Sequence, residues 1–451
     1  MKWTIFAIGL IGMVPLIQVL RRKPLEQPWI WILLGFFPVL LSVVPYLNLS
    51  AIAWPIWPGN VKGFQITALD LYALAVYVAL PRGRQPIPFR LSMIFYFSAV
   101  LLSIFFAQVS FAAVFYAWQL ARMFLIYAVV IKSGADERIV GWLMKGMAAG
   151  LVLEAFMTIW ERFVQGIIQT GGSFGHQNYL GMTSYFVIFP FFALLMAGQR
   201  GWLTAITPLA GTIIWVLTAS RATLGLGGFG LIALFIVSAL RKWTARKARV
   251  LLFGAVILAI LIPVGLSSLE TRFAANPLAD DYDERAVLID VAAKILSDHP
   301  MGIGANNFTL VANTGGYYAR APLSWMSSGA IVHNIYWLTA AETGYLGIIA
   351  LVILLLHPLV VALHCGWRHR KDQRGDLLLG IGMALLIVYI HSYFEWIFLT
   401  MDIQYLFAIM VGLVGGLATQ LGYWRRPYIQ DDQFGANRSA LRKVVVGEPV
   451  L

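Results

Sequence analysis

Long apolar runs recur along the whole chain, and they restrict its fold more than any other feature. Sixty per cent of the 451 residues are hydrophobic and only 12% are charged. A run of about 18 or more apolar residues can cross a bilayer as a helix. A transmembrane β-barrel would instead show short segments of alternating polarity. The sequence therefore predicts an all-α polytopic integral membrane protein.

We expect about 12–13 transmembrane helices. The candidate spans are residues 3–20, 29–47, 64–80, 91–107, 111–131, 139–160, 179–198, 202–219, 222–240, 250–268, 334–363, 377–399 and 402–423. They divide a single membrane domain into N-terminal spans (1–268), a large, partly helical extracytoplasmic loop (269–332), C-terminal spans (333–423) and a cytoplasmic tail (424–451). The first span is followed by basic residues rather than a cleavage site, so we expect it to be retained.

Basic residues fall on alternate loops. They are Arg21, Arg22, Lys23, Arg82, Arg84, Arg90, Lys132, Arg138, Arg200, Arg241, Lys242, Arg246, Lys247, Arg249, Arg368, Arg370, Lys371, Arg374, Arg425 and Arg426. The positive-inside rule makes this face cytoplasmic, so the N-terminus is outside and the C-terminus inside. The same rule explains the net charge of +12 without a nucleic-acid partner. We expect a multi-pass protein of the inner (plasma) membrane.

The hydrophilic stretch 269–330 is the most conspicuous loop, and loops of this length are typically functional or disordered. Within it, residues 283–292 have the pattern of an amphipathic helix that carries Arg285. Arg285 either forms an ion pair within that helix or binds an anion. Arg320 lies further along the same loop. No close histidine pair with a carboxylate lies on the outer face, so we expect no metal site and no cofactor.

Arg221 lies at the outer end of a helical hairpin, against the positive-inside bias. It either extends its guanidinium to lipid headgroups or clamps a phosphate, whose oxygens match the guanidinium geometry. Local sequence leaves both open.

His333 precedes a span and can act as a general base at a water-accessible boundary, or it is an ordinary interfacial polar group. Asn334 follows it, and Glu342 lies about two and a half turns further along the helix. His176 starts another span, where it caps the helix or lines the same cavity. Ionisable groups within spans are costly unless paired; here they are Asp70, Arg122, Glu154, His391 and Glu395. The sequence does not assign their partners.

Three ordered blocks resemble the O-antigen ligase and O-antigen polymerase superfamily of bacterial envelope glycosyltransferases. The first is Ser173-Phe174-Gly175-His176-Gln177-Asn178-Tyr179-Leu180-Gly181, and the second is Ser220-Arg221-Ala222. The third comprises Arg285, Asp298-His299-Pro300-Met301-Gly302-Ile303-Gly304-Ala305-Asn306-Asn307-Phe308, His333-Asn334 and Glu342-Thr343-Gly344. The blocks cover about residues 170–350, whereas the N-terminal spans match only in hydropathy.

The resemblance implies a metal-independent transferase whose site faces the extracytoplasmic membrane surface. The donor would be a glycan on undecaprenyl diphosphate, and the acceptor the lipid A–core or another lipid-linked repeat. It casts His333 as the base and Arg221 and Arg285 as diphosphate ligands. His176, Arg320, Asn334 and Glu342 would be accessory, and inversion at the anomeric carbon is the family expectation.

The competing interpretation is a transporter of a small anion such as bicarbonate. Transporters place their key charges near mid-membrane and often contain repeated halves with broken helices. In this sequence the candidate charges gather at one face and no repeat is visible, which favours the transferase.

Overall fold

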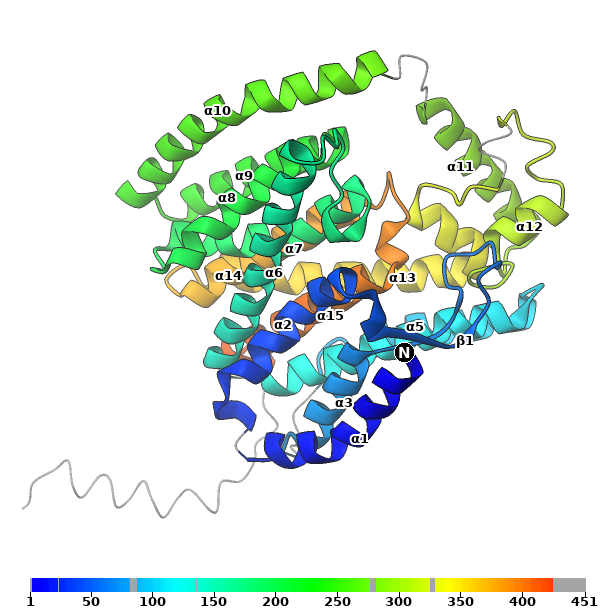
Figure 1. The fold of residues 1–451 in the computed structure, drawn as a ribbon, viewed down its shortest axis with the longest axis horizontal. Coiled ribbons are helices and arrows are strands. Elements are labelled where there is room, and N and C mark those ends of the chain that lie inside the picture. The colour runs from blue at the N-terminus through cyan, green and yellow to red at the C-terminus, as the bar shows by residue number, and fades with distance from the viewer. Residues whose placement is uncertain are drawn as a thin grey trace, which may run out of the picture.

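The computed structural model is almost wholly helical (Figure 1). It describes residues 2–22, 24–81, 87–134, 136–275, 281–324 and 329–424. Eight of the helices in these ranges are long and apolar enough to cross a membrane, and five further apolar helices are shorter. The prediction of a polytopic helical membrane protein is confirmed.

Each predicted span coincides with a helix. They are α1 (Lys2–Leu20), α2 (Pro28–Val43), α3 (Ala68–Ala79), α4 (Arg90–Ser103), α5 (Ser110–Ser133), α6 (Glu137–Phe163), α7 (Gln177–Ala197), α8 (Trp202–Leu217), α9 (Arg221–Arg241), α10 (Ala245–Ala275), α13 (Ile335–Arg368), α14 (Gln373–His391) and α15 (Met401–Gln420). Several boundaries differ from expectation by a few residues. The largest differences are at α10, which continues to Ala275, and at α14, which ends at His391 and leaves Glu395 outside the helix. The tail after residue 424 lies outside the described residues.

A small hairpin was not expected. β1 (Asn48–Ala53) pairs antiparallel with β2 (Gly63–Thr67) before α3 begins. The start of the predicted span 64–80 is therefore a strand, and α3 begins only where Thr67 and Asp70 form a reciprocal capping box. The Asp70 side chain accepts from the Thr67 N–H, and the Thr67 side chain accepts from the Asp70 N–H. Both free N–H groups are thereby satisfied, which fixes the start of the helix.

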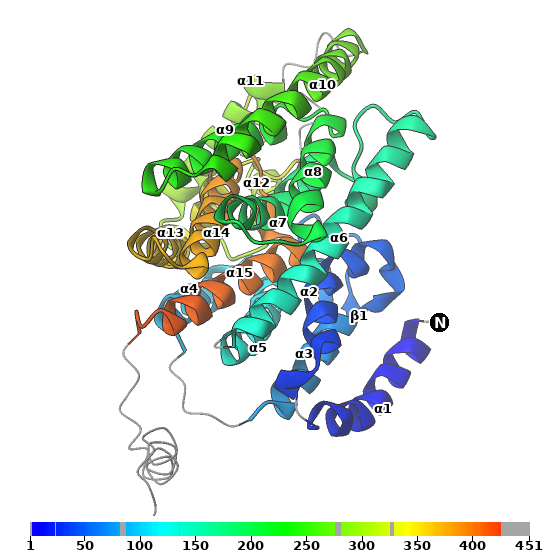
Figure 2. The same ribbon diagram turned by 90° about the vertical axis from the view of Figure 1, so that its left-hand side faces the viewer.

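The centre of the bundle is formed by α7, α14 and α15, which are the most buried of the long spans. α7 and α14 approach closely at Gly380, where an added Cβ would lie 2.7 Å from the Cα of Pro190. Small residues permit such close backbone packing between membrane helices. α10 is only 6% buried over its apolar segment. It and α1 lie on opposite sides of the bundle in both views (Figures 1 and 2).

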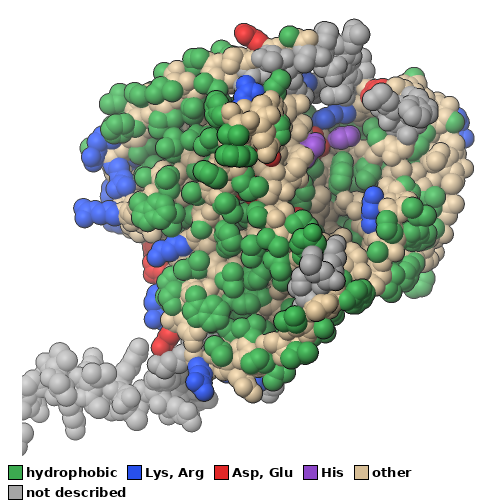
Figure 3. All heavy atoms as spheres, viewed as in Figure 1, with side chains coloured by type: hydrophobic (Ala, Val, Ile, Leu, Met, Phe, Trp, Pro, Cys, Tyr) green, Lys and Arg blue, Asp and Glu red, His purple; other side chains and the backbone are tan. Residues whose placement is uncertain are grey.

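The basic loops lie together at one end of the bundle. Arg246 donates to the carbonyl of Gly198 at 3.1 Å, which joins the start of α10 to the end of α7. Arg241, at the end of α9, pairs with Asp376 near the start of α14 and donates to the carbonyl of His369 at 3.0 Å. Figure 3 shows the resulting row of Lys and Arg side chains along one edge of the molecule.

The long loop is partly helical, as expected: it contains α11 (Asp281–Asp298) and α12 (Phe308–Thr314). Its glycine-containing motif packs against a kink in α13. The kink is Gly344, with φ +68°, and an added Cβ on Gly302 would lie 2.6 Å from the Gly344 nitrogen. The Phe308 N–H donates to Glu342 Oε1 at 3.1 Å. The motif therefore joins the loop to α13.

Two buried charges in the N-terminal half, Asp70 and Arg122, form an ion pair. Arg122 in α5 lies 3.3 Å from Asp70, and both side chains are almost fully buried. Arg122 also donates to the carbonyl of Gln65 at 2.6 Å, and the Tyr405 hydroxyl donates to Asp70 at 2.6 Å. The start of α3, the hairpin, α5 and α15 thus meet around a single ion pair.

Candidate functional site

Glu395 contacts several of the residues that were predicted for the site. It lies between α14 and the short 3-10 helix η5 (Ile397–Leu399), with its side chain only 3% exposed. Its Oε2 lies 3.2 Å from Nδ1 of His333. Its Oε1 accepts from Asn178 Nδ2 at 2.6 Å and from Arg285 Nη2 at 3.4 Å. One carboxylate therefore connects α7, α11 and the segment before α13.

His333 is held by its neighbours at the start of α13. The Asn334 side chain caps this helix by accepting from the N–H groups of Tyr336 and Trp337 at 2.9 and 3.1 Å. The Ile335 N–H donates to the carbonyl of Ser392 at 3.0 Å, just after α14. These bonds fix the backbone beside His333 relative to the loop that carries Glu395.

Arg285 spans two points on that loop, since its Nη1 also donates to the carbonyl of Phe394 at 3.1 Å. Its side chain remains 28% exposed. A guanidinium has five N–H donors, and these two bonds use two of them. Arg285 can therefore keep its place on Glu395 and still bind a ligand anion.

The start of α9 joins the same network. Ser220 Oγ donates to Asn178 Oδ1 at 2.6 Å and accepts from the Thr223 N–H at 3.2 Å, so it also caps α9. Ala219 before it has φ +48°, which is uncommon for a residue with a side chain. Arg221 follows as the first residue of α9 and is exposed.

His176 lies in the same electrostatic environment and caps α7, where its Nδ1 accepts from the Asn178 N–H at 3.3 Å. Burial lowers the pKa of His176. The negative charge of Glu395 opposes this shift, whereas His333 and Arg285 reinforce it. His176 is therefore neutral near pH 7.

Two carboxylates of α6 shape the turn before His176. Glu161 accepts from the N–H groups of Gly171 and Gly172 at 3.0 and 2.9 Å. Glu154 accepts from the Ser173 N–H at 3.0 Å and from its hydroxyl. The intramembrane Glu154 thus has its partner in the first sequence block, where it holds the turn that leads to His176 and Asn178.

Burial alone would raise the pKa of Glu395, but its positive neighbours outweigh that effect. The hydrogen bond with His333 and the charges of His333, Arg285 and His391 hold the pKa of this carboxyl below its usual value. Glu395 is therefore ionised near neutral pH. It can orient the imidazole through Nδ1, which leaves Nε2 as the nitrogen that accepts a proton.

Three helices begin at this network, namely α7, α9 and α13. The N-terminus of a helix carries a partial positive charge and free backbone N–H groups. Together with the guanidinium of Arg285, these termini make the surroundings favourable for an anion. Figure 3 shows histidine and basic side chains together in a recess of the surface.

Two of the predicted accessory residues are engaged elsewhere. Arg320 donates to the carbonyl of Gly315 at 3.0 Å and lies over the ring of Tyr317. Glu342 binds the backbone of Phe308. Among the described residues, neither side chain hydrogen bonds to Glu395 or His333.

Sequence reasoning singled out Glu395 only as an intramembrane charge, and Asn178 only as part of a motif. A usable signal for Glu395 was its position four residues after His391, at the end of a span. The proximity of this segment to α11 and His333 could not be predicted from the spacing of these residues along the sequence.

The network lies at the opposite end of the helices from the basic loops. α7, for example, starts beside His176 and ends just before Arg200. Its 21 residues correspond to about 30 Å, the thickness of the hydrocarbon core.

Residues 185–352 match the model of a protein family described as O-antigen ligase. The chain carries an O-antigen ligase domain. No curated protein matches the chain. The O-antigen ligase domain includes Arg221, Arg285 and His333, whereas Asn178 and Glu395 lie outside its matched range. The family implies an enzyme that transfers glycans. In this chain, residues outside the matched range complete the network around Glu395.

Proposed function

We propose that this protein transfers a glycan from an undecaprenyl-diphosphate carrier to an acceptor hydroxyl at the extracytoplasmic membrane face. The acceptor is the lipid A–core or another lipid-linked repeat. The observation that carries the proposal is the joint contact of Glu395 with His333 and Arg285. It brings a base and an anion ligand to the same place, as the reaction requires.

In the proposed reaction the acceptor oxygen forms a bond to the anomeric carbon as the bond from that carbon to the diphosphate oxygen breaks. The bonding electrons leave with the diphosphate. His333 Nε2 takes the hydroxyl proton, and Glu395 stabilises the imidazolium that results. Attack opposite the leaving group inverts the anomeric carbon.

Arg285 and Arg221 are proposed as the ligands of the diphosphate. Charge develops on the leaving oxygen in the transition state, so fixed cations near it lower the barrier. Arg285 has unused donors, and Arg221 begins a helix whose cap, Ser220, is bonded to Asn178 of the same network.

The charge pattern supports the proposed extracytoplasmic location of the site. The network and the basic loops lie at opposite ends of the same helices, and the basic end faces the cytoplasm by the positive-inside rule. Reporter fusions within α11 test this directly. A cytoplasmic signal there would overturn the proposed topology.

The activity test uses the purified full chain and a polyprenyl-diphosphate-linked oligosaccharide, with the two acceptor classes supplied in parallel. We expect transfer by the native protein, and its loss in His333→Ala and Arg221→Ala with normal membrane insertion. His364→Ala, an exposed histidine at the basic end, is the matched control and should retain full activity. Full turnover by His333→Ala and Arg221→Ala would defeat the assignment, and anion flux without transfer would favour the transporter.

A further inference from the structure

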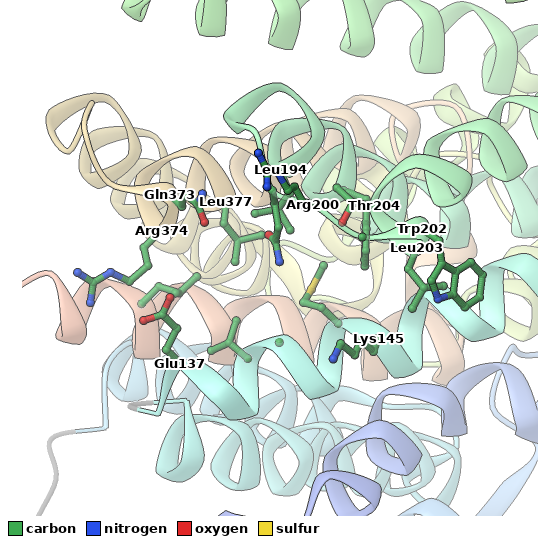
Figure 4. A pocket seen from close by; sticks show the side chains of 17 residues that line it. Glu137, Lys145, Leu194, Arg200, Trp202, Leu203, Thr204, Gln373, Arg374 and Leu377 are labelled. Carbon is green, nitrogen blue, oxygen red and sulfur yellow. The ribbon is translucent and has the colours of Figure 1, made fainter. Parts of the chain in front are cut away.

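A cavity lies at the basic end of the bundle, away from the network around Glu395. Its volume is about 380 Å³. In Figure 4, Glu137 and Lys145 come from α6 and Arg374 comes from the start of α14. Arg200 comes from the loop before α8, and Trp202 is the first residue of α8. Apolar side chains of α6, α7, α14 and α15 complete its lining. Three cations and one carboxylate line the cavity, so its polar part is net positive, and the rest of its wall is apolar.

Two of its cations are unpaired. Lys145 and Arg200 are exposed, and neither forms a hydrogen bond or an ion pair with any residue that the structure describes. Arg374 differs, because Asp372 holds it by a salt bridge of 2.5 Å. The charge available to a ligand thus comes from Lys145 and Arg200.

The position of Lys145 makes an unpaired charge costly. It lies eight residues into the membrane-spanning α6, about 12 Å along the axis from the helix start. An ionised side chain at such a depth is unfavourable unless it reaches an interface or meets an anion. Trp202 is 70% exposed beside the cavity, as is typical of a residue at the membrane–water boundary.

The start of α8 adds donors on the same side. Gly201 is its N-cap residue and has no side chain with which to accept a bond from the first turn. Residues 201–204 all line the cavity. Backbone N–H groups at a helix start favour an anion, in agreement with the two unpaired cations.

We propose that this cavity binds the headgroup of an anionic phospholipid from the cytoplasmic leaflet, with an acyl chain along its apolar wall. The phosphate lies between Lys145 and Arg200. Basic pockets between membrane helices on the cytoplasmic side suit such headgroups. A free phosphate would use the cations but leave the apolar wall exposed, so the cavity as a whole fits a lipid.

The test measures lipid binding to the purified full chain by native mass spectrometry, with phosphatidylglycerol and phosphatidylcholine as probes. We expect phosphatidylglycerol to bind about tenfold more tightly than phosphatidylcholine. Lys145→Gln combined with Arg200→Gln should remove this preference. The control, Arg249→Gln with Lys371→Gln, removes the same charge from exposed positions of the same face and should preserve it.

Two outcomes would overturn the proposal: equal loss in both double variants, which indicates general attraction to a basic surface, or a preference that survives Lys145→Gln with Arg200→Gln. Displacement of the lipid by millimolar inorganic phosphate would also overturn it, in favour of a soluble anion. Because Arg200 lies in a loop, the single variant Arg200→Gln provides a second test if the double variant does not fold. It should lose part of the preference, and full retention would count against the site.

Discussion

Glu395 Oε2 lies 3.2 Å from His333 Nδ1, although 62 residues separate them along the chain. Its other oxygen accepts from Asn178 and Arg285. The carboxylate is therefore held from two sides, and the imidazole has a fixed partner at one nitrogen. Such a partner sets the tautomer of a histidine and strengthens it as a base.

Glu395→Gln should reduce glycan transfer by about 100-fold, the lower end of what a positioned base contributes. The amide removes the negative charge that stabilises the imidazolium and can hold the wrong tautomer. Steady-state kinetics should show the loss in kcat, with KM for the lipid-linked donor changed less. Glu395→Asp keeps the charge and should recover part of the rate. An unchanged kcat in Glu395→Gln would remove Glu395 from the mechanism.

The low pKa of Glu395 predicts how stability depends on pH. Above its ordinary value near 4.5, the carboxylate is ionised in both folded and unfolded chains, and its contribution to stability is fully present. As the pH falls below that value toward the folded-state pKa, the contribution is lost. The difference in melting temperature between the native protein and Glu395→Gln should be constant from about pH 8 to 6 and shrink below about pH 4.5. A difference that grows on acidification would contradict the pKa direction.

The helical spans and the order of the motif blocks could be predicted because both are local. Apolar runs of bilayer length predict the helices, and alternate basic loops predict an orientation that the reporter fusions would test. The partners of Arg122, Glu154 and Glu395 could not be predicted, because each belongs to an element distant in sequence. Glu395 was further obscured by a span boundary: the apolar pattern continues to residue 399, but α14 ends at His391.

Helical phase does not place Glu342 beside His333, because nine residues make about two and a half turns and leave the two side chains on opposite sides of a regular helix. In the structure the Glu342 carboxylate accepts from the backbone of Phe308, next to the kink at Gly344. The packing of the long loop against α13 therefore determines the hydrogen-bond partner of Glu342.

Gly172→Ala should disturb the turn that leads to His176. Gly172 has φ +54°, and an added Cβ would lie 2.2 Å from Glu154 Oε2. We expect a destabilisation of about 2–3 kcal/mol from the strained backbone and the displaced carboxylate, together with reduced transfer. Gly175→Ala is the matched control: it also has positive φ, +68°, but open space around it, so the cost should be about 1 kcal/mol. Equal melting temperatures for the two variants would show that Glu154 does not hold this turn.

Removing one partner of the buried ion pair between Arg122 and Asp70 should cost more stability than removing both. Asp70→Ala leaves the buried Arg122 guanidinium with the carbonyl of Gln65, at 2.6 Å, as its remaining hydrogen-bond partner among the described residues. Such a change costs about 3–5 kcal/mol. Adding Arg122→Met removes the uncompensated charge and should recover a large part of the loss. Melting temperatures of the single and double variants in detergent measure this coupling. A double variant less stable than Asp70→Ala would show that Arg122 stabilises the bundle through contacts independent of Asp70.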